Sequence, residues 1–232
     1  MDLIWDGIRQ AFRILVTGDR NVWSIALRSL LISGSATAIA LVLGVEAGAL
    51  LAFRRFPGRT VAVALVNTGM GFPPVVVGLV VAIMLWRSGP LGRLGLIYTP
   101  GAMVIAQAVI ATPLVMGFTV AALGALPARL RTQLYGLGAS RMQMLWLVLQ
   151  EARLPLLAAI MAGFGAAVSE VGASLMVGGN IPGDTRVLTT AVTTEVSKGN
   201  FNVAIALSLI LLTLIFLVNV VLTAVQQQER RS

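Results

Sequence analysis

The sequence predicts an all-α integral membrane protein with five transmembrane helices, and three observations lead to this fold class. First, 57% of the 232 residues are hydrophobic and the mean hydropathy is +0.91, whereas soluble domains contain about 45–50% apolar residues. Second, five apolar stretches each reach the length of about 20 residues that a helix needs to cross the hydrocarbon core. Third, the arginines flank these stretches, which is typical of membrane topology signals and not of a nucleic-acid-binding face.

The five expected spans belong to one transmembrane domain that covers residues 25–226. Ahead of it, the segment 1–24 carries acidic residues early and lacks a continuous apolar run. We therefore expect an interfacial amphipathic helix on the outer side and not a cleaved signal peptide. Residues 227–232 form a polar tail. The spans are expected at about 29–53, 61–86, 102–124, 154–177 and 203–225, with a polar segment at 125–153.

The positions of the basic residues predict the orientation in the membrane. Nine of the 17 basic residues lie in the turn at 54–59, in the segment 125–153 and in the tail, and the other eight lie on the opposite side. This difference is small. However, Arg54, Arg55 and Arg59 concentrate positive charge in a tight turn beside two spans, which weighs more than a loose terminal segment. We therefore expect the amino terminus outside and the carboxyl terminus in the cytoplasm.

The residue types that the sequence lacks exclude several kinds of chemistry. Cysteine and histidine are absent, so the chain has no disulfide, no thiolate or imidazole metal site and no cysteine or histidine nucleophile. The only lysine, Lys198, lies in "VSKGN", so no G-x-x-x-x-G-K-[ST] loop is present to hold nucleotide phosphates. We expect no catalytic residue, no metal and no bound cofactor in this chain.

A polar, helix-like segment interrupts the apolar sequence between the third and fourth spans. Pro127 suits the first turn of a helix, and Gly136 and Gly138 end that helix. Ser140 and Gln143 form the S-x-x-Q capping box that starts a second helix. A plain connection between helices is typically 2–8 residues long, so the sequence favours a compact helical segment to which a soluble partner docks. An ordinary loop that happens to be helical is the alternative.

This segment resembles the cytoplasmic E-A-A loop of permease subunits of binding-protein-dependent ABC importers. The match centres on Gly138 in "GASRMQ". None of the three letters of the E-A-A motif is retained, and the leucine-proline pair of the family falls at Leu154 and Pro155 after four additional residues. The resemblance implies contact with a cytoplasmic ABC ATPase through Thr132, Gln133, Leu134, Gly138, Ala139, Ser140 and Arg141.

Two further stretches resemble permeases for molybdate, tungstate or sulfate: "GFPPVVVGLVVAIMLWRSGPLG" and "AVSEVGASLMVGGNIPG". The form "QEARLPLLAAIMAGFGAAVSEVGA" is most similar to tungstate permeases. The resemblance implies the type I importer fold in a bacterial inner membrane, as a homodimer with two ATPase subunits that carry the ATP and magnesium. It also implies an extracytoplasmic oxyanion-binding protein that delivers tungstate or, as the second choice, molybdate.

The translocation pathway is expected near a break in the second span. Pro73 and Pro74 remove two backbone donors, so they kink or break the helix and line the pathway, unless neighbouring helices absorb the kink. A buried carboxylate at Glu170 would repel an oxyanion, so it is either structural or part of an outer gate. The residues expected in the pathway or gate are Thr68, Pro73, Pro74, Thr112, Ser169, Glu170, Ser174 and Asn180.

A second class of function remains open from the residues alone. In an ion-coupled secondary transporter or channel, Glu46 and Glu170 would bind protons or cations. Such transporters usually contain matched halves with interrupted helices, and five spans without such a pairing do not fit that arrangement. A membrane enzyme is a weaker third alternative, because the sequence has no clustered carboxylates.

Overall fold

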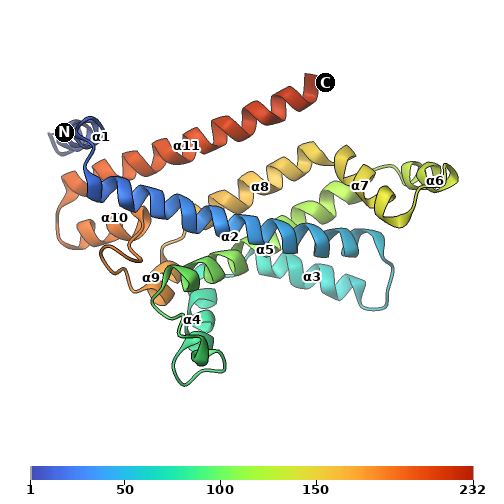
Figure 1. The fold of residues 1–232 in the computed structure, drawn as a ribbon, viewed down its shortest axis with the longest axis horizontal. Helices are drawn as coiled ribbons and strands as arrows, with labels where there is room; N and C mark the ends of the chain where they lie inside the picture. The colour runs from blue at the N-terminus through green and yellow to red at the C-terminus, as the bar shows by residue number, and fades with distance from the viewer. Residues whose placement is uncertain (1, 232) are drawn as a thin grey trace.

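The computed structural model describes residues 2–231, and the regular elements in this range are all helices. Met1 and Ser232, which belong to the expected segments 1–24 and 227–232, lie outside the described residues. The long helices run side by side along the longest axis of the molecule (Figure 1). These helices are α2 (Arg20–Phe53), α3 (Arg59–Met70), α5 (Pro100–Gly124), α8 (Arg153–Val168) and α11 (Phe201–Arg231).

Several of the shorter helices lie at the two ends of this bundle, whereas α4 projects from its side (Figure 1). The turn at 54–58, helices α6 and α7 and the carboxyl terminus lie at one end, and the amino terminus, α1 and α10 lie at the other (Figure 1). The chain ends are therefore on opposite sides, and the segments that carry the concentrated arginines share one end. The shorter elements are α1 (Asp2–Thr17), α4 (Pro74–Leu85), η1 (Gly92–Leu94), α6 (Ala128–Gly136), α7 (Arg141–Glu151), α9 (Gly172–Gly178) and α10 (Leu188–Ser197).

The expected amino-terminal segment is divided between two helices. The amphipathic helix α1 packs against α11 and ends before Asp19, whose carboxylate accepts hydrogen bonds from the amides of Asn21 and Val22 at 2.9 and 3.4 Å. This cap starts α2 at Arg20, nine residues before the expected first span. With 34 residues, α2 is about 51 Å long and exceeds the hydrocarbon core of about 30 Å.

Two of the expected spans are interrupted in the structure. The stretch 61–86 consists of α3 and α4, which meet at an angle of 101° across a break at 71–73. Pro73 has an extended backbone and Pro74 begins α4, so these prolines separate the helices as their missing amide donors require. The stretch 154–177 is also divided, because α8 ends at Val168 and α9 begins at Gly172. Among the described residues, α2, α5 and α11 are the uninterrupted helices long and apolar enough to cross a membrane.

The centre of the bundle is the close contact between α2 and α5. A Cβ at Gly44 would lie 2.8 Å from the Cβ of Val115, and a Cβ at Gly48 would lie 2.7 Å from the Cβ of Thr119. Glycines four residues apart let two helices approach closely, which is how membrane helices gain packing energy without a hydrophobic effect. The buried Thr119 hydroxyl donates to the carbonyl of Val115 at 2.7 Å, so it leaves no open donor in this contact.

Candidate translocation pathway and partner-docking surface

A cavity of about 670 Å³ opens where the two helix breaks face each other. Pro73 and Pro74 line it from the α3–α4 break, and Ser169 and Glu170 line it from the break between α8 and α9. Other residues of the α3–α4 break and residues of α3, α4, α5 and α8 form the rest of its wall, which is mostly apolar. Glu170 is the one charged group among the described lining residues, and no lysine or arginine is among them. An anion in this cavity would therefore find no fixed positive charge.

The Glu170 side chain is buried and its hydrogen bonds are local. Its exposed fraction is 7%, and its Oε1 atom accepts a hydrogen bond from the amide of Ala173 at 2.7 Å. Its main-chain carbonyl accepts a hydrogen bond from the Thr189 hydroxyl at 3.1 Å. The carboxylate thus satisfies an otherwise open amide in the first turn of α9, and the carbonyl ties the break to α10. This geometry supports the structural role of Glu170, while its role as a gate stays a prediction.

We predict that Glu170→Ala destabilises the protein by about 1–3 kcal/mol, because it leaves the buried amide of Ala173 without an acceptor. Glu170→Gln keeps an acceptor oxygen and should cost less. Thermal denaturation of the two purified variants measures the difference. Equal melting temperatures for the two variants would contradict the capping role. Loss of uptake in a stable Glu170→Gln variant would show that transport requires the charge.

Four expected pathway residues lie outside the lining of the cavity: Thr68, Thr112, Ser174 and Asn180. The hydroxyls of Thr68 and Thr112 donate to carbonyls of their own helices, at 2.8 and 2.6 Å. Ser174 is buried, and its Oγ accepts a hydrogen bond from the Nε2 of Gln107 at 3.2 Å, between α9 and α5. Their assignment to the pathway has no support in this geometry. Gln107 was missed from the sequence, although a glutamine inside an apolar span is itself an unusual feature.

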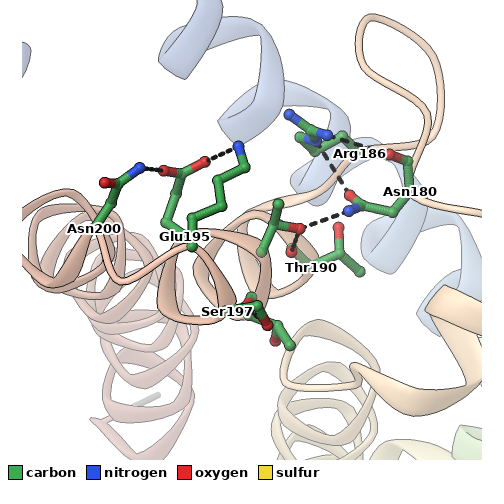
Figure 2. A network of polar contacts seen from close by, with 9 residues as sticks. Asn180, Arg186, Thr190, Glu195, Ser197 and Asn200 are labelled. Carbon is green, nitrogen blue, oxygen red and sulfur yellow. Dashed lines mark hydrogen bonds and ion pairs between the residues drawn. The ribbon is translucent and has the colours of Figure 1, made fainter.

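Asn180 belongs to a polar network at the α10 end of the bundle and not to the cavity (Figure 2). Its Nδ2 donates to the Thr194 hydroxyl at 2.7 Å, and its Oδ1 accepts from the Nε of Arg186 at 3.2 Å. Arg28 on α2 donates to the carbonyls of Gly183 and Arg186 at 2.7 and 2.9 Å. These bonds hold the loop at 179–187 against α2 and α10. The sequence did not predict a role for either arginine.

A second part of this network fixes the turn between α10 and α11 (Figure 2). The Glu195 carboxylate accepts hydrogen bonds from the Nζ of Lys198 and the Nδ2 of Asn200, both at 2.7 Å. The hydrogen bond from Lys198, followed by that from Asn200, lowers the pKa of Glu195 below its usual value. The stabilisation of this turn by the ionised Glu195 carboxylate is therefore present at neutral pH and is lost as the pH falls through this lowered pKa.

The polar segment at 125–153 forms two helices with a glycine turn between them. Helix α6 ends at Gly136, and Gly138 has a φ of +82°. The predicted capping box is confirmed: the Gln143 amide donates to the Ser140 hydroxyl at 3.3 Å, and the Ser140 amide donates to the Gln143 side chain at 2.9 Å. On its other side, α7 buries Met144 and Val148 against the ends of α2 and α5. A force on α7 therefore reaches both long helices.

The exposed face of this segment carries large apolar side chains. Leu137, Met142 and Trp146 are 84%, 75% and 64% exposed. A groove of about 500 Å³ includes Leu137 and Trp146, together with Leu134, Gly138 and Ala139 from the predicted contact set. Ser140 caps α7, Arg141 lines a different groove, and Thr132 and Gln133 are exposed on α6. Exposed apolar side chains gathered in this way are typical of interaction sites, and the docking of a partner here stays a prediction.

The two carboxylates required by an ion-coupled mechanism do not share a cavity. Glu46 lines a groove with Arg54 and Arg141 at one end of α2. Glu170 lines the cavity at the helix breaks, and the described lining residues of the two sites do not overlap. The geometry therefore gives no common ion site for this pair.

A helical membrane bundle with two broken helices around one cavity, and with an apolar helical surface at one end, is the architecture of a transport permease. The chain belongs to the family of binding-protein-dependent transport system inner membrane components, which matches residues 40–231. The resemblance predicted from the E-A-A-like segment is thus confirmed at the level of the family.

Relatives match this chain over most of its length. The probable anion ABC transporter permease protein of Haloferax volcanii is 42% identical over 210 residues, covering 87% of this chain and 90% of that protein. The tungstate uptake system permease protein of Peptoclostridium acidaminophilum is 38% identical over 228 residues, covering 98% and 100%. The molybdenum transport system permease protein of Escherichia coli K12 is 27% identical and covers 74% of this chain and 79% of that protein.

The fold is similar to solved ABC importer permeases. A structure of the MetNI methionine ABC transporter in an inward-facing conformation matches with a TM-score of 0.71 at 22% identity, covering 90% of this chain and 94% of that chain. An amino acid ABC transporter matches with a TM-score of 0.63 at 18% identity, covering 95% and 98%. These likenesses confirm the predicted all-α, type I importer-like fold.

Proposed function

We propose that this chain is the permease subunit of an ATP-driven importer that carries an oxyanion across the inner membrane, with tungstate as the first choice and molybdate as the second. The observation that carries the choice of substrate is the 38% identity to a tungstate permease along 98% of the chain. The lower identity to the molybdenum permease, over 74% of the chain, supports this order.

Energy for transport comes from two copies of a separate ATPase. The sequence has no G-x-x-x-x-G-K-[ST] loop to hold nucleotide phosphates, and its apolar groove on α6 and α7 is available to a soluble partner. Because α7 packs on the ends of α2 and α5, movement of the docked ATPases shifts these helices. The permease then alternates between outward-facing and inward-facing states without a catalytic residue of its own.

The cavity at the helix breaks is the translocation site in this proposal. It offers no lysine or arginine among its described lining residues, and the Glu170 carboxylate repels anions. The oxyanion is therefore held only weakly, and selectivity belongs to an extracytoplasmic binding protein. A second copy of the chain completes the pathway, because five spans are too few to enclose a route for a hydrated anion. The end with α6 and α7 faces the cytoplasm, and the amino terminus is outside.

Reconstitution of the importer tests this function. The permease, the ATPase and the binding protein encoded by neighbouring genes are placed in liposomes, and the internal tungsten and molybdenum are measured. We expect uptake that requires external binding protein and ATP and that fails with an ATPase unable to hydrolyse ATP. The permease alone should hydrolyse no ATP. Uptake without the ATPase that collapses with the proton gradient would contradict the proposal.

A further inference from the structure

A further groove, with three charged residues in a mostly apolar lining, lies between the end of α2 and the helices α6 and α7. It has a volume of about 610 Å³ and is separate from both the translocation cavity and the apolar groove on the outer side of α7. Its wall is mostly apolar, with leucine, methionine and phenylalanine side chains. Its charged lining residues, among those the structure describes, are Glu46 and Arg54 on α2 and Arg141 on α7.

These three charges have no partners within the described part of the chain. The side chains of Glu46, Arg54 and Arg141 are exposed, and they make no hydrogen bond or ion pair with any described residue. By contrast, two other arginines bond to main-chain carbonyls: the Nε of Arg59, in the same turn, donates to the carbonyl of Leu51 at 2.7 Å, and Arg28 donates to two carbonyls. The groove therefore holds two guanidinium groups and one carboxylate that are available to a ligand.

The position of Glu46 indicates what kind of ligand this is. Ile39, Leu43 and Leu50 are exposed on α2 at intervals that place them on the same side of the helix as Glu46, and this helix is apolar enough to span a membrane. The stripe is an apolar surface suited to contact with lipid, and it leads into the groove, because Glu46 and Leu50 also line the groove. A carboxylate that faces lipid is costly unless a cation or a hydrogen-bond donor pairs with it. Arg54 follows Glu46 by eight residues, which is about 12 Å along the helix.

We propose that this groove binds the headgroup of an aminophospholipid such as phosphatidylethanolamine. Arg54 and Arg141 hold the phosphodiester, since guanidinium groups bind phosphate through paired N–H donors. The ammonium group of the lipid donates to the Glu46 carboxylate, and an acyl chain follows the exposed stripe of α2. A glycerol headgroup offers Glu46 hydroxyl donors but no positive charge, and a choline headgroup has no N–H to donate to it.

Such a lipid would connect the membrane helix α2 to the face of α7 that lines this groove. Arg141 begins α7, and Met144 and Leu145 of the same helix also line the groove. The apolar groove for the ATPase lies on a different side, with Trp146 and Leu147 in its wall. The lipid therefore leaves the docking surface free while it links the docked helix to α2. This assignment does not depend on which oxyanion is transported.

Competition between lipids tests the proposal. The purified protein is placed in nanodiscs with equal amounts of phosphatidylethanolamine, phosphatidylglycerol and phosphatidylcholine, and retained lipids are identified by native mass spectrometry. We expect phosphatidylethanolamine to be enriched about tenfold over each of the others, as one charge-assisted contact allows. Equal retention of the three lipids would overturn the proposal.

Variants assign the contacts within the groove. Glu46→Gln should abolish the preference for phosphatidylethanolamine over phosphatidylglycerol, and Arg54→Gln should reduce the retention of both. Arg55→Gln is the matched control, because Arg55 is an exposed neighbour in the same turn but does not line the groove. If phosphatidylglycerol were retained in preference and Glu46→Gln did not change its retention, the groove would be a general anionic-lipid site. That result would overturn the proposal. If inorganic phosphate stabilised the delipidated protein as much as phosphatidylethanolamine does, the groove would be a phosphate site without lipid selectivity. That result would also overturn the proposal.

Discussion

Replacing Gly138 by valine is expected to lower uptake by about tenfold or more while the amount of protein in the membrane stays unchanged. The φ of Gly138 is +82°, a region that costs an L-residue about 1–2 kcal/mol and a β-branched residue more. The turn between α6 and α7 relieves this strain by changing its backbone, which moves the two helices relative to each other. If the displaced helices lose about 1.4 kcal/mol of binding free energy, the affinity for the ATPase already falls tenfold.

The matched control for this prediction is Gly136→Val. Gly136 ends α6 two residues earlier, and its φ is not in the left-handed region. A Cβ at either glycine would meet no other heavy atom within 4 Å, so the two variants add the same side chain to open space and differ in backbone strain. We expect Gly136→Val to retain most of the uptake and to co-purify with the ATPase, and Gly138→Val to lose the ATPase. Normal uptake by Gly138→Val would show that the turn has no role in docking.

The structure of the polar segment at 125–153 could be predicted closely, because the residues that determine it are near one another in the sequence. The S-x-x-Q pattern forms its capping box within four residues, and a glycine after a helix adopts a positive φ through its own freedom. The same applies to the break at Pro73 and Pro74, since a missing amide donor acts at its own position. The residues of α6 differ from the E-A-A motif, but the segment still forms two helices joined by a glycine turn.

The parts that could not be predicted depend on contacts between distant segments. The angle of 101° between α3 and α4 depends on how α4 packs against α9, nearly 100 residues later in the sequence. The break after Val168 contains no proline, and the charged Glu170 was its one local sign. The hydroxyls of Thr68 and Thr112 donate to carbonyls of their own helices, and the sequence does not show which direction such a hydroxyl faces, so their place in the pathway stays a prediction.

The contact between α4 and α9 leads to the second large expected effect. Replacing Gly78 by alanine should lower the stability of the protein by about 1–3 kcal/mol, the usual cost of overpacking, and should strongly reduce uptake. A Cβ at Gly78 would overlap the Cα of Ala173 and would lie 2.8 Å from the Cβ of that residue. Because the obstacle is backbone, no side chain can rotate away, and α4 must separate from α9. Pro74 and Val77 on α4 line the cavity at the helix breaks, so this separation changes the shape of the proposed pathway.

Thermal denaturation and uptake of purified Gly78→Ala measure both effects, and a change of 1 kcal/mol should shift the melting temperature by about 2–4 °C. Gly165→Ala is the matched control, since a Cβ there would meet no other atom within 4 Å, and alanine is favoured over glycine inside a helix. The double variant Gly78→Ala with Ala173→Gly removes only the Cβ of Ala173. Because the Cα remains in the way, it should recover little stability. Full recovery would locate the clash in the side chain, and an unchanged melting temperature of Gly78→Ala would mean that α4 does not pack on α9 in the folded permease.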